Sequence, residues 1–430
     1  MKARPRTLSM CGLLFGCAGG PAYGLTACGG KDFVRGPGLG GLSPSGNLRA
    51  APESHRLSRP SHLNYFSNYF IGAFLERGGI ARRRARAGGR ASVIGKWGNG
   101  PMAESTHKFG VHSDYGRLRE AVVGILDDFT LPPFDPALVH YNAELREALE
   151  ATGGKPLRVK AAFPERYEKT QEQLEAVVAV YDERGVEVHR PRPYSEEEKE
   201  YLGFLQGGHA LLYPADPVYV LGNHFLEINI RRAYRRKEVF PLRDAVMPLI
   251  AHDPEARHAA MPPAQPFTPS GGGPGPYLEG GDIMIYGKDI IVGESDIASN
   301  RAGTDWLKRY LEPYGYQVHP MPMRGSFLHA LGVMCLLREG LLMAYLPPLV
   351  DGLPEPVKDW EVIELTEQEA RTFATVGVSL DEKTYMLPAG HNRVIDELDR
   401  RGVEPVPVPA DQIGFWGGSI RCATLPVARG

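Results

Sequence analysis

Hydrophobic and polar positions follow two different periods from about residue 109 to the end of the chain. Short apolar runs bounded by glycine or other turn residues predict strands, whereas apolar residues three and four positions apart predict amphipathic helices. The predicted helices are 164–184, 301–311, 367–374 and 391–401. The predicted strands and hairpins are 118–126, 186–188, 218–230, 282–292, 316–319, 333–345, 379–387 and 403–408.

Several of these elements have their own start and stop signals. Gly185 follows the helix predicted at 164–184, and glycine is the preferred residue just past a helix end. Thr366 and Glu369 have the spacing of a capping box at the start of 367–374. From residue 282 onward, hairpin, helix and strand recur at a spacing of roughly 45–55 residues. This order predicts an α/β fold built from repeated units of the βαβ type.

The first 101 residues differ in composition from the rest. They contain 15 Lys and Arg against three Asp and Glu, a net charge of +12, which leaves −14 for the remainder because the whole chain carries −2. The segment is rich in glycine, arginine and proline and lacks a sustained period, so it buries too little apolar surface to fold. We therefore predict a basic, disordered extension at 1–101 and one folded domain at 102–430.

Three explanations for the extension stay open. A basic tail binds nucleic acid by neutralising phosphates. Residues 2–28 faintly resemble a secretory lipoprotein signal, with a charged start and an apolar stretch before Cys28. The third explanation is a start codon assigned too early, with Met102 as the true first residue. The abrupt onset of folded patterning at Phe109 favours the third explanation.

Composition narrows the classes of function. The five cysteines are few, odd in number and not clustered with histidine at zinc-ligand spacing. We expect no disulfide framework, no metal, no cofactor, and a reducing, cytoplasmic environment. The apolar runs are too short to span a membrane. We therefore expect neither membrane nor nucleic acid as a partner, and leave open whether the chain forms a homodimer.

One cysteine has a context typical of a nucleophile. Cys422 follows Gly417-Gly418-Ser419-Ile420-Arg421, and a thiol behind two glycines has little side-chain cover. A cysteine with a histidine elsewhere in the chain is typical of thiol enzymes. The alternative is a small buried core residue, the usual state of free cysteine. Cys335, within an apolar run, fits that alternative.

Three further positions combine acids, glycine and histidine. Glu279 and Asp282 flank two glycines, so both carboxylates are predicted on a tight turn that a charged substrate can approach. An ordinary acidic turn is the alternative. His329 is a lone histidine among apolar residues, and Asp216 precedes a proline at the start of a predicted strand. Taken singly, each is equally well a structural residue.

Taken together, these residues resemble the guanidine-modifying superfamily, which contains amidinotransferases, arginine deiminases and dimethylarginine hydrolases. The resemblance covers about 109–430 and implies a pseudo-fivefold α/β propeller of ββαβ modules. Within the superfamily, 111–120 and 220–223 are most similar to the glycine and inosamine amidinotransferases. The features that carry the resemblance are 111–120, Asp216-Pro217 with the following strand and Gly222-Asn223, Glu279-Gly280-Gly281-Asp282, 300–307, Leu328-His329, and Gly417-Gly418 before Cys422.

The resemblance also implies roles for individual residues. Cys422 matches the nucleophile, His329 the general acid and base, and Glu279 the acidic partner of the histidine. Carboxylates hold the planar guanidinium in register, and the thiolate attacks its carbon. An amine or water then resolves the covalent amidino-cysteine. Substrate-binding roles fall to four residues, Asp216, Asp282, Gly418 and Arg421.

The chain departs from the family's motifs at three positions. Many relatives have His-x-Asp, in which the aspartate also contacts the guanidinium, but Leu331 stands there in this chain. Ala215 occupies a position that is often arginine, and Arg421 one that amidinotransferases tend to fill with histidine. A less charged or alkylated guanidine would explain Leu331. Asp282 acting in place of the missing acid is the other explanation.

We therefore predict an amidinotransferase that moves an amidino group from an arginine-like donor to an amine acceptor, without a cofactor. A hydrolase of arginine or methylated arginine is the alternative within the same family. A non-catalytic propeller that binds a guanidine or a protein is the alternative from another class. The basic run at 231–237 is interpreted as a solvated helix face rather than a clamp for a substrate carboxylate.

Overall fold

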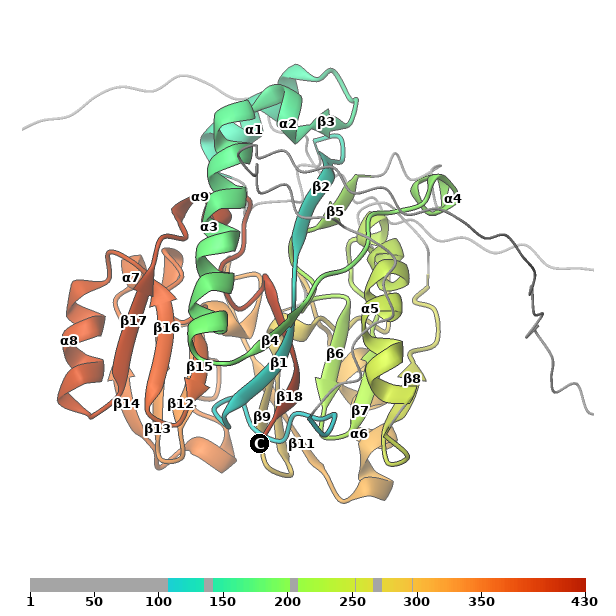
Figure 1. Cartoon of the computed structure of the whole chain (residues 1–430). Coiled ribbons are helices and arrows are strands. Elements are labelled where there is room, and N and C mark those ends of the chain that lie inside the picture. Colours follow the sequence, from blue (N-terminus) through green and yellow to red (C-terminus); the bar gives the residue numbers. More distant parts are fainter. Residues whose placement is uncertain (1–106, 135–141, 202–207, 252, 266–272, 296) are drawn as a thin grey trace, which may run out of the picture. The chain divides into compact units, whose positions relative to one another are not determined.

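The computed structural model describes residues 107–134, 142–201, 208–251, 253–265, 273–295 and 297–430 (Figure 1). These residues form a mixed α/β fold of small sheets with helices between them. The predicted extension at 1–101 lies outside the described residues. Within the described ranges, no helix is both long and apolar enough to cross a membrane.

Four successive three-stranded sheets share one plan. In each, two strands form an antiparallel hairpin and the third returns parallel to the second. A parallel return requires a crossover, which α5 (Val239–Ala251), α6 (Arg301–Leu311) and α8 (Asn392–Arg400) supply in three of the sheets. The strands are β6 (Val218–Leu221), β7 (His224–Glu227) and β8 (Arg257–Ala260); β9 (Ile283–Tyr286), β10 (Asp289–Glu294) and β11 (Gln317–Pro322); β12 (Met334–Arg338), β13 (Leu341–Ala344) and β14 (Glu361–Glu364); and β15 (Val378–Asp381), β16 (Thr384–Pro388) and β17 (Glu404–Val408).

A fifth sheet of the same plan joins the two ends of the described chain. Strand β18 (Thr424–Arg429) pairs antiparallel with β1 (Leu118–Val123), and β4 (Glu187–His189) lies parallel to β1. Helix α3 (Pro164–Glu183) lies between β1 and β4 in the sequence. Every residue of β18 is buried. The segment that carries Cys422 therefore leads directly into a strand anchored on the N-terminal side of the fold.

The remaining elements are short. Strand β2 (Ile125–Leu131) pairs with β3 (Leu157–Arg158) and β5 (His209–Leu211) in a sixth sheet of different plan. The short helices are α1 (Ala143–Ala151), α2 (Val159–Ala162), α4 (Glu196–Glu200), α7 (Glu367–Arg371) and α9 (Asp411–Phe415). The 3-10 turns that matter for the site are η2 (Ala233–Glu238), η3 (Gly280–Asp282) and η5 (Ala330–Gly332).

Most of the predicted elements are found where the sequence places them. Helix α6 has the predicted bounds, and α3 ends just before Gly185, whose φ is +69°. The capping box of Thr366 and Glu369 forms both of its hydrogen bonds. Helix α7 stops at Arg371, short of the predicted 374, where the chain turns and Phe373 adopts a φ of +69°.

Two parts of the fold differ from what the sequence predicted. The region 379–387 is a hairpin, β15 and β16, rather than one strand-like run. Helix α5 was not predicted, because Pro241 and Pro248 fall within it and helix interiors normally exclude proline. Its residues are largely apolar, and burial compensates for the lost backbone hydrogen bonds.

Three apolar clusters make up the buried interior. One contains Cys422, a second contains Ala215 and Leu278, and the third contains Leu331. Cys422 and Leu331 therefore belong to two of the clusters, and Asp216 and Glu279 directly follow residues of the other.

Candidate active site

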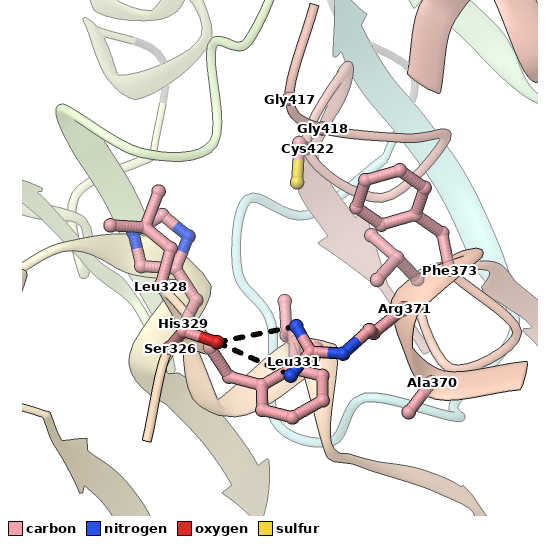
Figure 2. A pocket seen from close by; sticks show the side chains of 13 residues that line it. Ser326, Leu328, His329, Leu331, Ala370, Arg371, Phe373, Gly417, Gly418 and Cys422 are labelled. Carbon is pink, nitrogen blue, oxygen red and sulfur yellow. Dashed lines mark hydrogen bonds between the residues drawn. The ribbon is translucent and has the colours of Figure 1, made fainter. Parts of the chain in front are cut away.

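A cavity of about 270 Å³ brings several of the predicted residues together (Figure 2). Figure 2 shows the sulfur of Cys422 pointing into the cavity, with His329 at its side and the Arg371 guanidinium reaching toward Ser326. Ligand pockets usually measure roughly 300–1,000 Å³, so this one suits a small metabolite. The lining residues are Ser326, Phe327, Leu328, His329, Leu331, Gly332, Ala370, Arg371, Phe373, Val376, Gly417, Gly418 and Cys422.

Cys422 lies on the loop between α9 and β18, and glycine shapes that loop. Gly417 has a φ of +98°, which glycine adopts without steric cost. The backbone N–H of Gly418 donates to the Tyr213 hydroxyl at 3.0 Å. A Cβ on Gly418 would come within 2.7 Å of the Tyr213 ring, so only glycine allows this approach. The Gly-Gly pair therefore fixes the loop that presents the thiol.

His329 and Glu279 form a buried pair beside the cavity. The Nε2 atom of His329 lies 2.8 Å from Oε2 of Glu279. The other carboxylate oxygen of Glu279 accepts a hydrogen bond from the backbone N–H of Arg231 at 2.8 Å. One oxygen of Glu279 therefore contacts the imidazole, while the backbone holds the other oxygen and so fixes the carboxylate.

The two glycines of the Glu-Gly-Gly-Asp motif make room for this pair. A Cβ on Gly281 would lie 2.4 Å from Nδ1 of His329, and a Cβ on Gly280 would lie 1.8 Å from the carbonyl oxygen of Ala215. Gly280 also donates its backbone N–H to the carbonyl of Asp216 at 3.0 Å. The motif therefore brings three segments into contact with one another, and both of its carboxylates, predicted on a tight turn open to a charged substrate, are buried.

Asp216 has one occupied and one unoccupied carboxylate oxygen. Its Oδ2 accepts from Arg235 at 2.9 Å, whereas its buried Oδ1 has no hydrogen-bond partner among the described residues. The residue is not in the wall of the cavity. It lies close behind the wall, because the N–H of Ala215 donates to the carbonyl of Cys422 at 3.3 Å. A buried acceptor without a partner is costly, so Oδ1 is suited to a donor brought by a ligand.

Burial and the neighbouring charges leave both central residues protonated at neutral pH, one as a cation and the other as a neutral thiol. Burial disfavours the imidazolium, but the hydrogen bond to Glu279 and the charges of Asp216 and Asp282 outweigh it and raise the pKa of His329 to about 9. Burial raises the pKa of the Cys422 thiol to about 12, and the negative charge of Asp216 adds to this effect. Without a ligand at neutral pH, His329 is therefore protonated and Cys422 is a neutral thiol.

We expect Cys422 to be alkylated slowly by iodoacetamide at neutral pH, with a rate that keeps rising above pH 9, because only the thiolate reacts. Asp216→Asn removes a charge that raises the thiol pKa, so this variant should react faster at each pH. Peptide-resolved mass spectrometry separates Cys422 from the other cysteines. Cys335 is the control, because burial also raises its pKa to about 12 but it lies outside the cavity wall. A rate that levels off near pH 7 would contradict this assignment.

Like Asp216, the predicted substrate-binding residues Asp282 and Arg421 are absent from the cavity wall. Both oxygens of Asp282 accept backbone hydrogen bonds, from Ala330 at 2.8 Å and from Ser299 at 3.1 Å, so Asp282 braces the turn that carries His329. Arg421 donates to the carbonyl of Thr424 and the hydroxyl of Tyr219. Both residues have structural contacts here, and their substrate-binding roles stay predictions.

The interpretation of the basic run at 231–237 is corrected. It was predicted as a solvated helix face, but Arg235 and Lys237 are largely buried. Arg235 forms ion pairs with Asp216 at 2.9 Å and with Glu238 at 2.7 Å. The pairing satisfies charges that the interior would otherwise disfavour. Sequence spacing alone could not show that the partner of Arg235 is 19 residues away on another segment.

The sequence analysis missed the outer part of the cavity. Arg371 and Phe373 enter it from the end of α7, and Phe327 enters from the loop before His329. The positive φ of Phe373 marks a strained backbone next to a site, but no sequence signal predicts it. Within the described ranges, no group of histidine, cysteine and carboxylate side chains has the arrangement of a metal site.

Comparisons with known proteins find amidinotransferases that are similar to most of this chain. L-arginine:L-lysine amidinotransferase of Pseudomonas savastanoi pv. phaseolicola is 22% identical over 354 aligned residues, covering 74% of this chain and 93% of that protein. Inosamine-phosphate amidinotransferase 1 of Streptomyces griseus is 24% identical over 349 residues, covering 74% and 96%. No family model matches the chain.

Solved structures show the same fold. The inosamine-phosphate amidinotransferase from Streptomyces griseus matches with a TM-score of 0.63 and 20% identity, covering 75% of this chain and 97% of that one. DDAH from Pseudomonas aeruginosa, complexed with citrulline, matches with a TM-score of 0.51 and 18% identity, covering 72% and 99%. The relatives that match by sequence over nearly their whole length include amidinotransferases.

Proposed function

Because the chain belongs to the guanidine-modifying superfamily, we propose that it is an amidinotransferase that moves an amidino group from a guanidino donor to an amine. The single observation that carries the proposal is the convergence of a cysteine thiol and a buried histidine–glutamate pair on one cavity. The hydrolase alternative has less support, since the relatives named above as matching by sequence over nearly their whole length are amidinotransferases.

Donor binding activates the thiol in this proposal. The guanidinium is a cation that donates hydrogen bonds, and the unoccupied Oδ1 of buried Asp216 is an acceptor close to Cys422. Once the cation lies beside Cys422, it offsets the negative charge of Asp216 that raised the thiol pKa. The thiol proton leaves to water, and the positive charge of the bound cation then stabilises the thiolate. Thiolate and guanidinium carbon are then held in contact.

The first half-reaction forms a carbon–sulfur bond. The thiolate of Cys422 attacks the guanidinium carbon, and the resulting tetrahedral intermediate breaks its bond to the substituted nitrogen. Protonated His329 gives its proton to that nitrogen, so the donor leaves as a neutral amine. Cys422 then carries an amidino group. Glu279 is a positioning residue, because it keeps His329 oriented and protonated through their 2.8 Å contact.

The second half-reaction restores the enzyme. The acceptor amine enters the space that the leaving amine vacated and attacks the amidino carbon. Neutral His329 takes a proton from the attacking nitrogen, and the carbon–sulfur bond breaks to return the thiolate. Apolar side chains around the cavity, including Leu331 and Phe373, disfavour water as the competing nucleophile.

We also propose that the five sheets of one plan are the modules of a pseudo-fivefold α/β propeller. The proposal is supported by the shared hairpin-and-parallel-return plan and by the closure of one module with β18 and β1. A cytoplasmic location is proposed from the small number of cysteines alone.

Product analysis tests the proposed function. The protein is incubated with arginine, with and without glycine or lysine as the acceptor, and amino acids are separated by chromatography. We expect ornithine and a new guanidino compound only when an acceptor is present. Citrulline formation without an acceptor would instead support the hydrolase alternative. Absence of both products, together with absence of an amidino adduct on Cys422, would contradict turnover of arginine.

A further inference from the structure

We infer that the preferred donor is an ω-guanidino acid with one anionic end and no α-ammonium group, and that Arg371 with Ser326 binds that anionic end. This inference rests on the proposed function and specifies the donor class of the same cavity. Arg371 and Ser326 lie in the wall of the cavity opposite Cys422, and Figure 2 shows them in contact.

Arg371 is held in place but keeps donor capacity. Its Nη1 and Nη2 atoms lie 3.2 and 3.3 Å from the Ser326 hydroxyl oxygen, and Nε and Nη2 contact Glu367 at 2.8 Å. The guanidinium also lies over the Phe327 ring, 4.8 Å from its centroid. The Nη1 atom carries two hydrogens and contacts Ser326 alone among the described residues. Its second hydrogen, with the Ser326 hydroxyl proton, can bind an oxyanion.

Apolar side chains line the cavity together with Cys422 and Arg371. They include Phe327, Leu331, Phe373 and Val376. A chain of methylene groups is the part of a substrate that such a surface accommodates without loss of hydrogen bonds. The guanidinium of the donor would then lie at the thiol, its methylene chain against the apolar side chains, and its oxyanion at Arg371.

None of the described residues that line the cavity is an aspartate or glutamate, and Arg371 and protonated His329 are both cationic. Glu367, outside the wall, is already paired with Arg371. An α-amino acid such as arginine would place its ammonium group beside its carboxylate, near Arg371. Like charges at short distance repel, so the ammonium group lowers affinity. A guanidino acid without that group keeps the attraction and avoids the repulsion.

Three small molecules separate these contributions. 4-Guanidinobutyrate has only the carboxylate at its far end, agmatine only an ammonium group, and arginine both. Binding is measured by calorimetry on Cys422→Ser, which cannot complete the reaction. We expect 4-guanidinobutyrate to bind most tightly, arginine about tenfold more weakly, and agmatine most weakly. Arg371→Gln should weaken 4-guanidinobutyrate about tenfold and leave agmatine unchanged or tighter, because a half-exposed charged hydrogen bond contributes modestly.

Arg393→Gln is the matched control. Arg393 is 45% exposed and pairs with Glu369 of α7, as Arg371 is 48% exposed and pairs with Glu367 of α7. Arg393 lines a neighbouring cavity rather than this one. We expect its replacement to leave the order of the three ligands unchanged. Arg371→Lys keeps the charge but not the planar fork and should give an intermediate loss for 4-guanidinobutyrate.

Each outcome bears on one proposal. Equal effects of Arg371→Gln on 4-guanidinobutyrate and agmatine, binding of agmatine as tight as that of 4-guanidinobutyrate, or no binding of any of the three would overturn the donor assignment. Intact-protein mass spectrometry of the unmodified sequence with the same molecules tests the reaction separately. The expected ligand order without any amidino adduct would refute the proposed transfer and leave the binding assignment standing. Adducts without the expected order would refute only the donor assignment.

Discussion

Cys422→Ala is expected to abolish turnover, because no other described side chain in the cavity wall can form the covalent amidino intermediate. Removing a nucleophile of this kind leaves only substrate positioning, and rates typically fall by about four to six orders of magnitude. The measurement is product formation from a guanidino donor, with mass spectrometry of quenched mixtures to detect the amidino adduct. The adduct should appear on the natural sequence and be absent from Cys422→Ala.

Cys335→Ala provides the matched control for Cys422. Both thiols are buried and burial raises both pKa values to about 12, but Cys335 faces the hydroxyl of Tyr385 at 3.5 Å in the apolar interior. We expect Cys335→Ala to keep its activity at a small cost in stability. Guanidine binding shows whether an inactive Cys422→Ala protein is folded. A Cys422→Ala protein that still turned over donor would refute the thiol mechanism.

Leu331→Asp is expected to strengthen binding of arginine and to weaken binding of an alkylated guanidine. Leu331 is buried and lines the cavity at the position where many relatives have an aspartate. A carboxylate there adds a charge-assisted hydrogen bond to an unsubstituted guanidinium, which contributes on the order of 1.5–3 kcal/mol, or roughly ten- to hundredfold in affinity. The same carboxylate removes the apolar contact that an alkyl group needs. Binding constants for both ligands, on both proteins, measure the effect.

Stability gives a second measurement for the same substitution. A buried carboxylate without a partner is unfavourable, so Leu331→Asp without ligand should unfold at a lower temperature, and arginine should restore much of the loss. Leu331→Asn is the control, because it has the same shape without the charge. If Asp and Asn variants respond alike, or if both ligands shift in the same direction, the side chain at 331 does not contact the guanidinium.

The sequence was sufficient to predict the elements that have strong local signals. The bounds of α6 and the end of α3 follow from apolar spacing and from Gly185. The residues of the central pair also follow from motifs, since Glu279 and His329 occur in local patterns that resemble a known family. These features depend on neighbours in the chain, and a single sequence displays them directly.

The rest of the site depends on contacts between distant segments. The motif Glu279-Gly280-Gly281-Asp282 does not reveal that both oxygens of Asp282 bond to the backbone of Ser299 and Ala330. Arg421 looks accessible next to Cys422 but bonds to Tyr219 in the interior. Burial decides such cases, and burial of polar groups has no local sequence signature. Arg371 was missed for a different reason. It is half-exposed, and the sequence does not show that the end of α7 lies beside the loop of Ser326.

Strand β1 is translated long before its partner β18. A module whose strands are so far apart in the sequence stays open until β18 has left the ribosome, since distant contacts are the slowest to form. Cys422 immediately precedes β18, so its loop is anchored only when that module closes. A nascent chain can already hold Glu279 against His329 and still have its thiol unplaced. Placement of the thiol therefore waits for β18, and a nascent chain that lacks this strand has the histidine–glutamate pair without a positioned nucleophile.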